Sequence, residues 1–467
     1  MSNIISYGIG LPSFRIEEDK LFPPGGKKGM MRSVCFSDED SITLAYDALS
    51  DCLNVLNGDL IKVNTQIDGI LFASSTPLFQ NRYHASYLAD LLNLQQGILA
   101  LDFINTSRSG TDALLLANEL IDSGKYKNIL VVASEVCFPE IGKEQSTPFG
   151  HGACALLLSN DKGIANITKA KSYSASFAEE FSYKLNALQY DPRFSRDEGF
   201  KTNLADALTR FATNPRNYQA IVLNAMYARM AGPLFTKAGF EETPFAKDTL
   251  TAKTGNTGAA HALLLLINEI EQGKKNILLA DYTNGTNLFE VQINEAPEHL
   301  SLQQALAHHQ LIDTYQNYLC LRKAGNFSAP EYTTRDMFSS EMMLQREKET
   351  LLYRGGFQCV KCETVYYLRS ARCKHCKGDE FKTIQLQNTG TVYSFTHEHY
   401  FPSSFPPITM VIIDLDSGGR MTVQQTDTMY AEKNKIEIGA RVKLVLRKMI
   451  ENDLKPNYFW KAIAHDE

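Results

Sequence analysis

The chain has 467 residues, of which 44% are hydrophobic and 21% charged, and its formal net charge is −6. This length predicts about three structural units, and the composition is typical of a globular protein. The negative charge gives no overall attraction to nucleic acid or anionic lipid. No basic region followed by an apolar run opens the sequence, and its longest strongly apolar stretch, HALLLLINEI, is too short to span a bilayer.

Nine cysteines are distributed unevenly: four lie within residues 359–376 and the others are scattered. An odd number of cysteines without a secretion signal favours a reducing compartment over a disulfide framework. We therefore expect a cytoplasmic protein that has no membrane partner.

Two segments in the first part of the chain resemble each other. SGTDALLLANELIDSGKYKNILVVAS begins at Ser109, and TGAAHALLLLINEIEQGKKNILLADY begins at Thr257. Each predicts a Leu-rich helix, a stop at Gly124 or Gly273, and a strand that is buried on both faces. Such a repeat predicts two α/β halves that pack against each other.

The repeat also relates two turns. Ser107 and Asn256 each lie 17 residues before the glycine stop of their own half. Both turns therefore precede a helix, where unpaired N–H groups favour a developing negative charge. Two such turns can converge on one pocket. The alternative is that both side chains are ordinary helix caps.

Further motifs extend the pattern over residues 1–295. They read ISYGIGLPSFRI, FSDEDSITLAYDAL, DGILFASSTP, DFINTSRSGTDAL, FGHGACALLLS, AKTGNTGAAHALLLL and YTNGTNLFEVQI. In this order they resemble the thiolase superfamily, and within it archaeal-type hydroxymethylglutaryl-CoA synthases and type III ketoacyl synthases. The resemblance implies a duplicated, five-layer αβαβα fold whose halves comprise residues 1–165 and 166–295. It also implies a homodimer formed through this fold.

In that family a cysteine attacks an acyl-CoA thioester, and a histidine and an asparagine assist it. The resemblance places the cysteine position at Ser107, the histidine position at Asn224 and the asparagine position at Asn256. It places the carboxylate of the hydroxymethylglutaryl-CoA synthases near Thr76, where there is no acid. A hydroxyl needs a base to attack at neutral pH, and a carboxamide cannot accept the proton. The three positions therefore predict a vestigial site.

Other side chains offer no clear replacement. His84, His151 and His261 are each predicted to be structural or surface residues, and Cys154 is predicted to be a small core residue.

The C-terminal part contains the motif CVKCETVYYLRSARCKHC. Its four thiols, in two CxxC pairs, predict a closed tetrahedral site in which zinc is structural. The ligands are Cys359, Cys362, Cys373 and Cys376. We assign residues 356–380 to a zinc ribbon. Short alternating strands follow and predict an OB-type β-barrel at residues 381–467. Residues 296–355 are interpreted as a helical linker.

The order of ribbon and barrel resembles the zinc-ribbon/OB-fold proteins that accompany thiolases and hydroxymethylglutaryl-CoA synthases. This resemblance implies contact with coenzyme A or acyl-CoA and with a catalytic thiolase-like subunit. The main hypothesis is a non-catalytic synthase-like subunit of an acyltransferase complex, with its scaffold module fused to it. One alternative is an active condensing enzyme or acyltransferase that uses Ser107 as its nucleophile. The least favoured alternative is a nucleic-acid-binding OB-fold protein, since no basic groove is evident.

Overall fold

The structure is a computed structural model that divides into two compact units. Unit 1 comprises Met1–Val34 and Leu44–Leu311, and unit 2 comprises Cys35–Thr43 and Ile312–Glu467. The structure describes residues 2–22, 25–54, 66–145, 149–183, 186–211, 218–240, 245–322, 341–400, 403, 405–429, 436–449 and 456–465. Residues 323–340 of the predicted linker lie outside these ranges.

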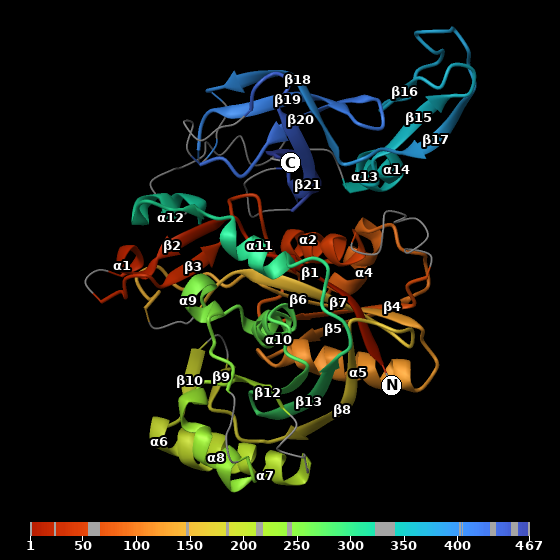
Figure 1. Ribbon diagram of the computed structural model, residues 1–467. Helices are drawn as coiled ribbons and strands as arrows, with labels where there is room; N and C mark the ends of the chain where they lie inside the picture. Colours follow the sequence, from red (N-terminus) through yellow and green to blue (C-terminus); the bar gives the residue numbers. More distant parts are fainter. Residues whose placement is uncertain are drawn as a thin grey trace. The chain divides into compact units, whose positions relative to one another are not determined.

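Unit 1 is built on a nine-stranded sheet (Figure 1). In spatial order its strands are β11 (Ala220–Asn224), β12 (Asn276–Tyr282), β13 (Gly285–Ile293), β8 (Ala165–Ser174), β1 (Asn3–Gly10), β7 (Gly152–Ser159), β6 (Asn128–Glu135), β4 (Gly69–Ser74) and β5 (Leu99–Ile104). The sheet confirms the predicted duplication. β4 and β6 are parallel, and antiparallel β7 and β1 follow them; β11, β12, β13 and β8 repeat the same succession. The two halves join where β1 pairs with β8.

The predicted Leu-rich helices are α5 (Ser109–Asp122) and α10 (His261–Glu271). Each is followed by a glycine in the left-handed region, Gly124 with φ 73° and Gly273 with φ 74°. A glycine adopts this conformation without the steric cost of a Cβ atom, so it ends a helix efficiently. Both predicted helix stops are confirmed.

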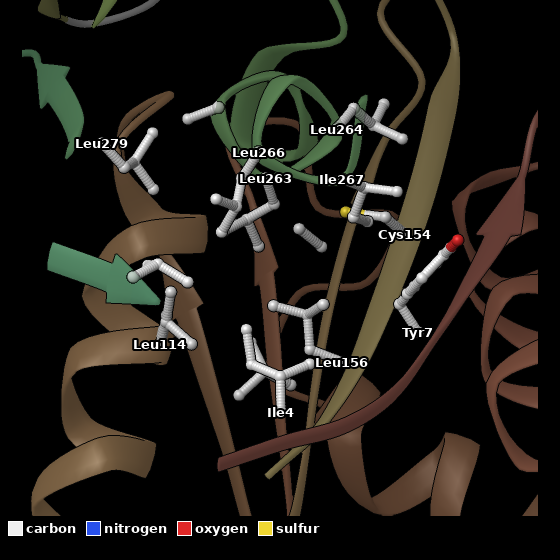
Figure 2. Close-up of a cluster of buried hydrophobic side chains, with 14 of the residues drawn as sticks. Ile4, Tyr7, Leu114, Cys154, Leu156, Leu263, Leu264, Leu266, Ile267 and Leu279 are labelled. Carbon is white, nitrogen blue, oxygen red and sulfur yellow. The ribbon is translucent and has the colours of Figure 1, made fainter. Parts of the chain in front are cut away.

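Helices α5 and α10 contact each other and share one apolar core with strands from both halves. Figure 2 shows Leu114 of α5 and Leu263 of α10 pointing into this core. Cys154 is fully buried there, as predicted, and burial raises the pKa of its thiol. The two halves are therefore held together by packing along the helices as well as by the strand pairing.

Smaller elements complete unit 1. They are β2 (Phe14–Glu17), α1 (Glu18–Leu21), β3 (Met31–Val34), α2 (Ser41–Asn54, which begins in unit 2), α4 (His84–Leu91), β9 (Glu180–Tyr183), β10 (Asn186–Gln189), α6 (Pro192–Phe194), the π-helix η1 (Ser195–Lys201), α7 (Thr202–Phe211), η3 (Ala228–Met230), α8 (Gly232–Lys237), α9 (Leu250–Thr254), η4 (Gly258–Ala260), α11 (Ser301–Ala307) and β14 (Gln310–Leu311). None of the helices in the described part of the chain has the length and apolar character needed to span a bilayer.

Unit 2 contains a three-stranded sheet and a closed five-stranded barrel. The sheet is β15 (Gly355–Cys359), β16 (Val365–Tyr366) and β17 (Phe381–Gln385), and the barrel is β18 (Thr389–Glu398), β19 (Ile408–Leu415), β20 (Arg420–Gln425), β22 (Tyr458–Ala464) and β21 (Arg441–Lys448). The barrel confirms the OB-type prediction. The helices of unit 2 are α12 (Tyr315–Leu321), α13 (Glu341–Arg346) and α14 (Lys348–Leu351).

Residues 35–43, from the N-terminal part of the chain, belong to unit 2. The Asp38 carboxylate accepts a hydrogen bond from Lys461 Nζ at 2.6 Å. Arg447 pairs with Glu39 at 3.0 Å. All four side chains are buried; Asp38 supplies the counter-charge of Lys461, whereas burial raises the pKa of Glu39. In the sequence these acids form part of the motif FSDEDSITLAYDAL, which does not indicate their partners.

Candidate active site and metal centre

The turns that hold Ser107 and Asn256 lie against each other. Ser107 follows β5 and precedes α5, and Asn256 precedes η4 and α10. Gly110 and Ala259 each lie three residues further on, and a Cβ atom on Gly110 would be only 2.1 Å from the Ala259 carbonyl oxygen. The backbones of the two turns are therefore in contact, as the repeat predicted.

The Ser107 hydroxyl lies 2.9 Å from the Thr283 hydroxyl. Thr283 donates its own proton to the Tyr282 carbonyl at 2.7 Å. The Thr283 proton can also turn to the Ser107 oxygen, so either hydroxyl can be the donor in the bond between them. The relay ends on a backbone carbonyl, which does not take up a proton as a general base does.

Asn224 occupies the end of β11, directly opposite Asp281 on β12. Its Nδ2 donates to Asp281 Oδ1 at 2.9 Å, and Thr111 of α5 donates to the other carboxylate oxygen at 2.7 Å. Burial raises the pKa of Asp281 to about 6. The position at which the resemblance expects a histidine therefore holds a carboxamide that is bound to a buried carboxyl group.

Asn256 is bonded within its own turn. Its Oδ1 accepts a hydrogen bond from the Gly258 N–H at 2.8 Å. Its Nδ2 donates no hydrogen bond within the described residues. Asn256 lies one residue before Thr257, the N-cap of η4, and Ser107 lies one residue before Arg108, the N-cap of α5; in the Ser107 turn the comparable bond runs from the Arg108 N–H to the Thr106 hydroxyl. Asn256 therefore presents a donor that is available to a ligand.

Glu135 joins the site from the end of β6, and its side chain is buried. Its carboxylate accepts hydrogen bonds from the Ser75 N–H and the Ala259 N–H, both at 3.0 Å, and from the Thr76 hydroxyl. The expected acid is absent at Thr76, yet a carboxylate from another strand contacts Thr76. An acid that ends the apolar strand NILVVASE was the signal available in the sequence.

The three histidines considered from the sequence form structural hydrogen bonds, and none of these bonds involves Ser107. All three rings are buried. Their ring partners are Asp102 (2.8 Å) and the Phe79 N–H (3.0 Å) for His84, the Cys137 carbonyl (3.0 Å) for His151, and Asp248 (3.2 Å) for His261. The Nε2 atom of His84 faces the Phe79 N–H, and its Nδ1 atom faces Asp102.

Comparison with known proteins agrees with the fold of the two domains. The family 3-oxoacyl-[acyl-carrier-protein (ACP)] synthase III matches residues 101–176, and the family described as "ChsH2, C-terminal OB-fold domain" matches residues 383–447. The chain therefore carries a thiolase-like synthase domain and an OB-fold domain.

Individual relatives support the thiolase-like domain. The hydroxymethylglutaryl-CoA synthase of Methanosphaera stadtmanae is 23% identical over 342 residues, covering 69% of this chain and 98% of that protein. The solved synthase III of Aquifex aeolicus superposes with a TM-score of 0.53 at 19% identity, covering 62% of this chain and 100% of its own. A hydroxymethylglutaryl-CoA synthase complexed with CoA gives a TM-score of 0.56 at 18% identity, and the match covers 70% of this chain and 91% of that protein. At these identities the solved structures establish the fold alone.

The four-cysteine cluster precedes the OB-fold domain. All four Sγ atoms lie within 4.8 Å of one another. Cys359 and Cys376 are 3.5 Å apart, and Cys362 and Cys373 are 3.4 Å apart. Tetrahedral coordination with metal–sulfur bonds of about 2.3 Å places sulfurs roughly 3.8 Å apart. The cluster therefore fits a metal ion held by four thiolates.

Proposed function

We propose that this protein is a non-catalytic, synthase-like subunit of a thiolase-type acyltransferase complex. In the complex it binds acyl-CoA, while a catalytic thiolase-like partner supplies the nucleophile and the base. The observation that carries the proposal is the relay from Ser107 through Thr283 to the Tyr282 carbonyl. An alcohol that has no base does not open a thioester at neutral pH.

The same turns remain suited to binding. Asn256 Nδ2 is an available donor, and Ser107 lies at the N-terminal end of α5, where the helix dipole favours the oxygen of a carbonyl group. A hydroxymethylglutaryl-CoA synthase of the same fold has been solved with CoA, which supports CoA as the carrier. The proposal includes a homodimer formed through the thiolase-like domain.

Purified alone and incubated with acetyl-CoA, the protein should form no acyl adduct and should show no acyl transfer. Intact-mass spectrometry and release of free CoA measure the two quantities. The variant Ser107→Cys/Asn224→His introduces a thiol and an imidazole at the two predicted positions and should gain an adduct on the new thiol, because a helix N-terminus and an imidazole favour the thiolate. Each single substitution serves as the matched control and should react far less.

Two results would contradict the proposal. One is an acyl adduct on Ser107 of the wild-type protein, and the other is steady acyl transfer that Ser107→Ala abolishes. Co-purification from the native source, with mass identification of the bound chains, tests membership of the complex. Recovery of this chain without a thiolase-like partner argues against the complex.

The cysteine cluster is proposed to hold one structural zinc ion. Four thiolates leave no coordination position for a substrate, so the ion would order the ribbon and take no part in chemistry. Elemental analysis of the purified protein should find about one zinc per chain, and Cys373→Ser should lose most of it. Cys320→Ser, outside the cluster, should keep full occupancy. Equal zinc content in the two variants would contradict the assignment.

A further inference from the structure

Asp281 is the buried carboxyl group of the Ser107 site, and its surroundings are unusual for an ionised acid. The side chain is fully buried, and its two hydrogen-bond partners, Thr111 and Asn224, are uncharged. No ion pair to it is found within the described residues. Burial raises the pKa of Asp281 to about 6, so both protonation states are populated near neutral pH.

The Thr111 hydroxyl can serve either state of Asp281. Its oxygen lies 2.7 Å from Asp281 Oδ2 and 3.0 Å from the Arg108 carbonyl, and it accepts the amide of Asn287 at 3.0 Å. When Asp281 is ionised, Thr111 donates to it. When Asp281 is protonated, the carboxyl donates to Thr111, whose own proton turns to the Arg108 carbonyl. A proton can therefore be added without leaving a buried polar group unpaired.

This carboxyl group is linked to the proposed binding turn through Thr111. Ser107 precedes α5 and Thr111 lies in the first turn of that helix, where its hydroxyl is 3.0 Å from the carbonyl of Arg108, the residue that follows Ser107. Asn224, the other partner, is itself one of the predicted site residues. Both Ser107 and Asn224 are half-buried, so a ligand that contacts them would displace water from the surroundings of Asn224, which is a hydrogen-bond partner of Asp281.

We propose that Asp281 is the proton-linked residue of this site, and that the site binds the carbonyl of an acyl thioester with uptake of one proton from solvent. The inference rests on the proposed function, which supplies acyl-CoA as the ligand. The partial negative charge of a carbonyl oxygen and the loss of water both disfavour a charge on Asp281. The proton binds Oδ2 when the ligand enters and returns to solvent when it leaves, and no covalent bond of the ligand changes.

The groups that surround Asp281 are mostly uncharged or lie in an ion pair, so Asp281 is the group in this site that we expect to change its charge. The charge of Arg108, at the N-cap of α5, lowers the pKa of Asp281, and the charge of Asp112, in the first turn of α5, raises it. The neighbouring strands β11 and β13 present the uncharged amides of Asn224 and Asn287. Helix α10 packs on β12 with apolar side chains of the shared core. Asp112 is 30% exposed and pairs with Arg108 at 3.3 Å, which makes it a suitable control.

Titration calorimetry with acetyl-CoA, run in two buffers of different ionisation enthalpy, counts the protons taken up by the wild-type protein. CoA without an acyl group is the matched ligand, and it should show little uptake. Above about pH 6 the affinity for acetyl-CoA should fall by up to roughly tenfold per pH unit. Asp281→Asn imitates the protonated carboxyl, so its affinity should not change with pH and should match that of the wild type at low pH. Asp112→Asn should keep the wild-type pH dependence.

The outcomes separate the two proposals. Acetyl-CoA binding without proton uptake by the wild-type protein overturns the role of Asp281 and leaves the proposed function standing. An unchanged pH profile in Asp281→Asn also overturns it. Failure of both acetyl-CoA and CoA to bind at any pH contradicts the proposed function itself. Because the wild-type calorimetry requires no substitution, it decides the matter even when Asp281→Asn does not fold.

Discussion

Asp38→Ala should lower the free energy of unfolding of unit 2 by about 3–5 kcal/mol, because it leaves a buried ammonium group without its counter-charge. The side chains of Asp38 and Lys461 are 1% and 3% exposed, and their charged atoms are 2.6 Å apart. Burial would raise the pKa of Asp38, but Lys461 and Arg447 outweigh it and lower the pKa. This carboxylate therefore stabilises the fold at neutral pH, and its contribution is lost as pH falls through the lowered pKa.

Denaturant unfolding of the full chain measures this effect through tryptophan fluorescence. The single tryptophan, Trp460, is buried in the barrel and stacks with Arg354, so its emission reports on unit 2. Asp414→Ala is the matched control, because Asp414 and Arg420 form a barrel ion pair that is about half exposed. Its loss should cost less than about 1 kcal/mol. Equal shifts for Asp38→Ala and Asp414→Ala would contradict the assignment.

A double substitution tests why Asp38→Ala loses stability. In Asp38→Leu/Lys461→Met both charges are replaced by apolar side chains, so no ion remains buried. Replacing a whole buried pair is often neutral, and the double variant should therefore regain much of the stability that Asp38→Ala loses. A double variant as unstable as Asp38→Ala would show that the segment acts through its shape and not through its charge.

The framework could be predicted from the sequence because it rests on local signals. The glycine stops Gly124 and Gly273, the Leu-rich helices and the alternating barrel strands each act over a few residues. The repeat then related Ser107 to Asn256 without any knowledge of contacts. Asp38 and Lys461 are 423 positions apart, and nothing in either local pattern indicates that they pair.

The hydrogen-bonding partners at the site were missed for a similar reason. Asp281 and Glu135 each interrupt or end an apolar strand, which marks them as unusual, but their partners come from other elements. Whether a hydroxyl faces a base or a carbonyl depends on side-chain directions across two strands and a helix. The sequence predicts a vestigial site at Ser107 from the residue types at three positions, whereas the partner of its hydroxyl, Thr283, is visible only in three dimensions.

Gly110→Ala should destabilise unit 1 by about 1–3 kcal/mol or more, the cost of an overpacked contact. Within a helix the same change usually stabilises by about 0.5–1 kcal/mol, so the sign is the test. The new Cβ atom would lie 2.1 Å from the Ala259 carbonyl oxygen. No rotamer relieves a contact with backbone, so α5 and the Asn256 turn must separate. The affinity for acetyl-CoA should fall together with the stability, because the proposed site uses both turns.

Gly232→Ala provides the control for Gly110→Ala. Gly232 begins α8, and a Cβ atom there meets nothing within 4 Å. Alanine at this position should be neutral or stabilising, and it should leave acetyl-CoA binding unchanged. Thermal unfolding and a binding titration on the two variants compare the close-packed glycine with the open one. If Gly110→Ala raises the melting temperature as Gly232→Ala does, the turns are not in the contact that the binding proposal requires.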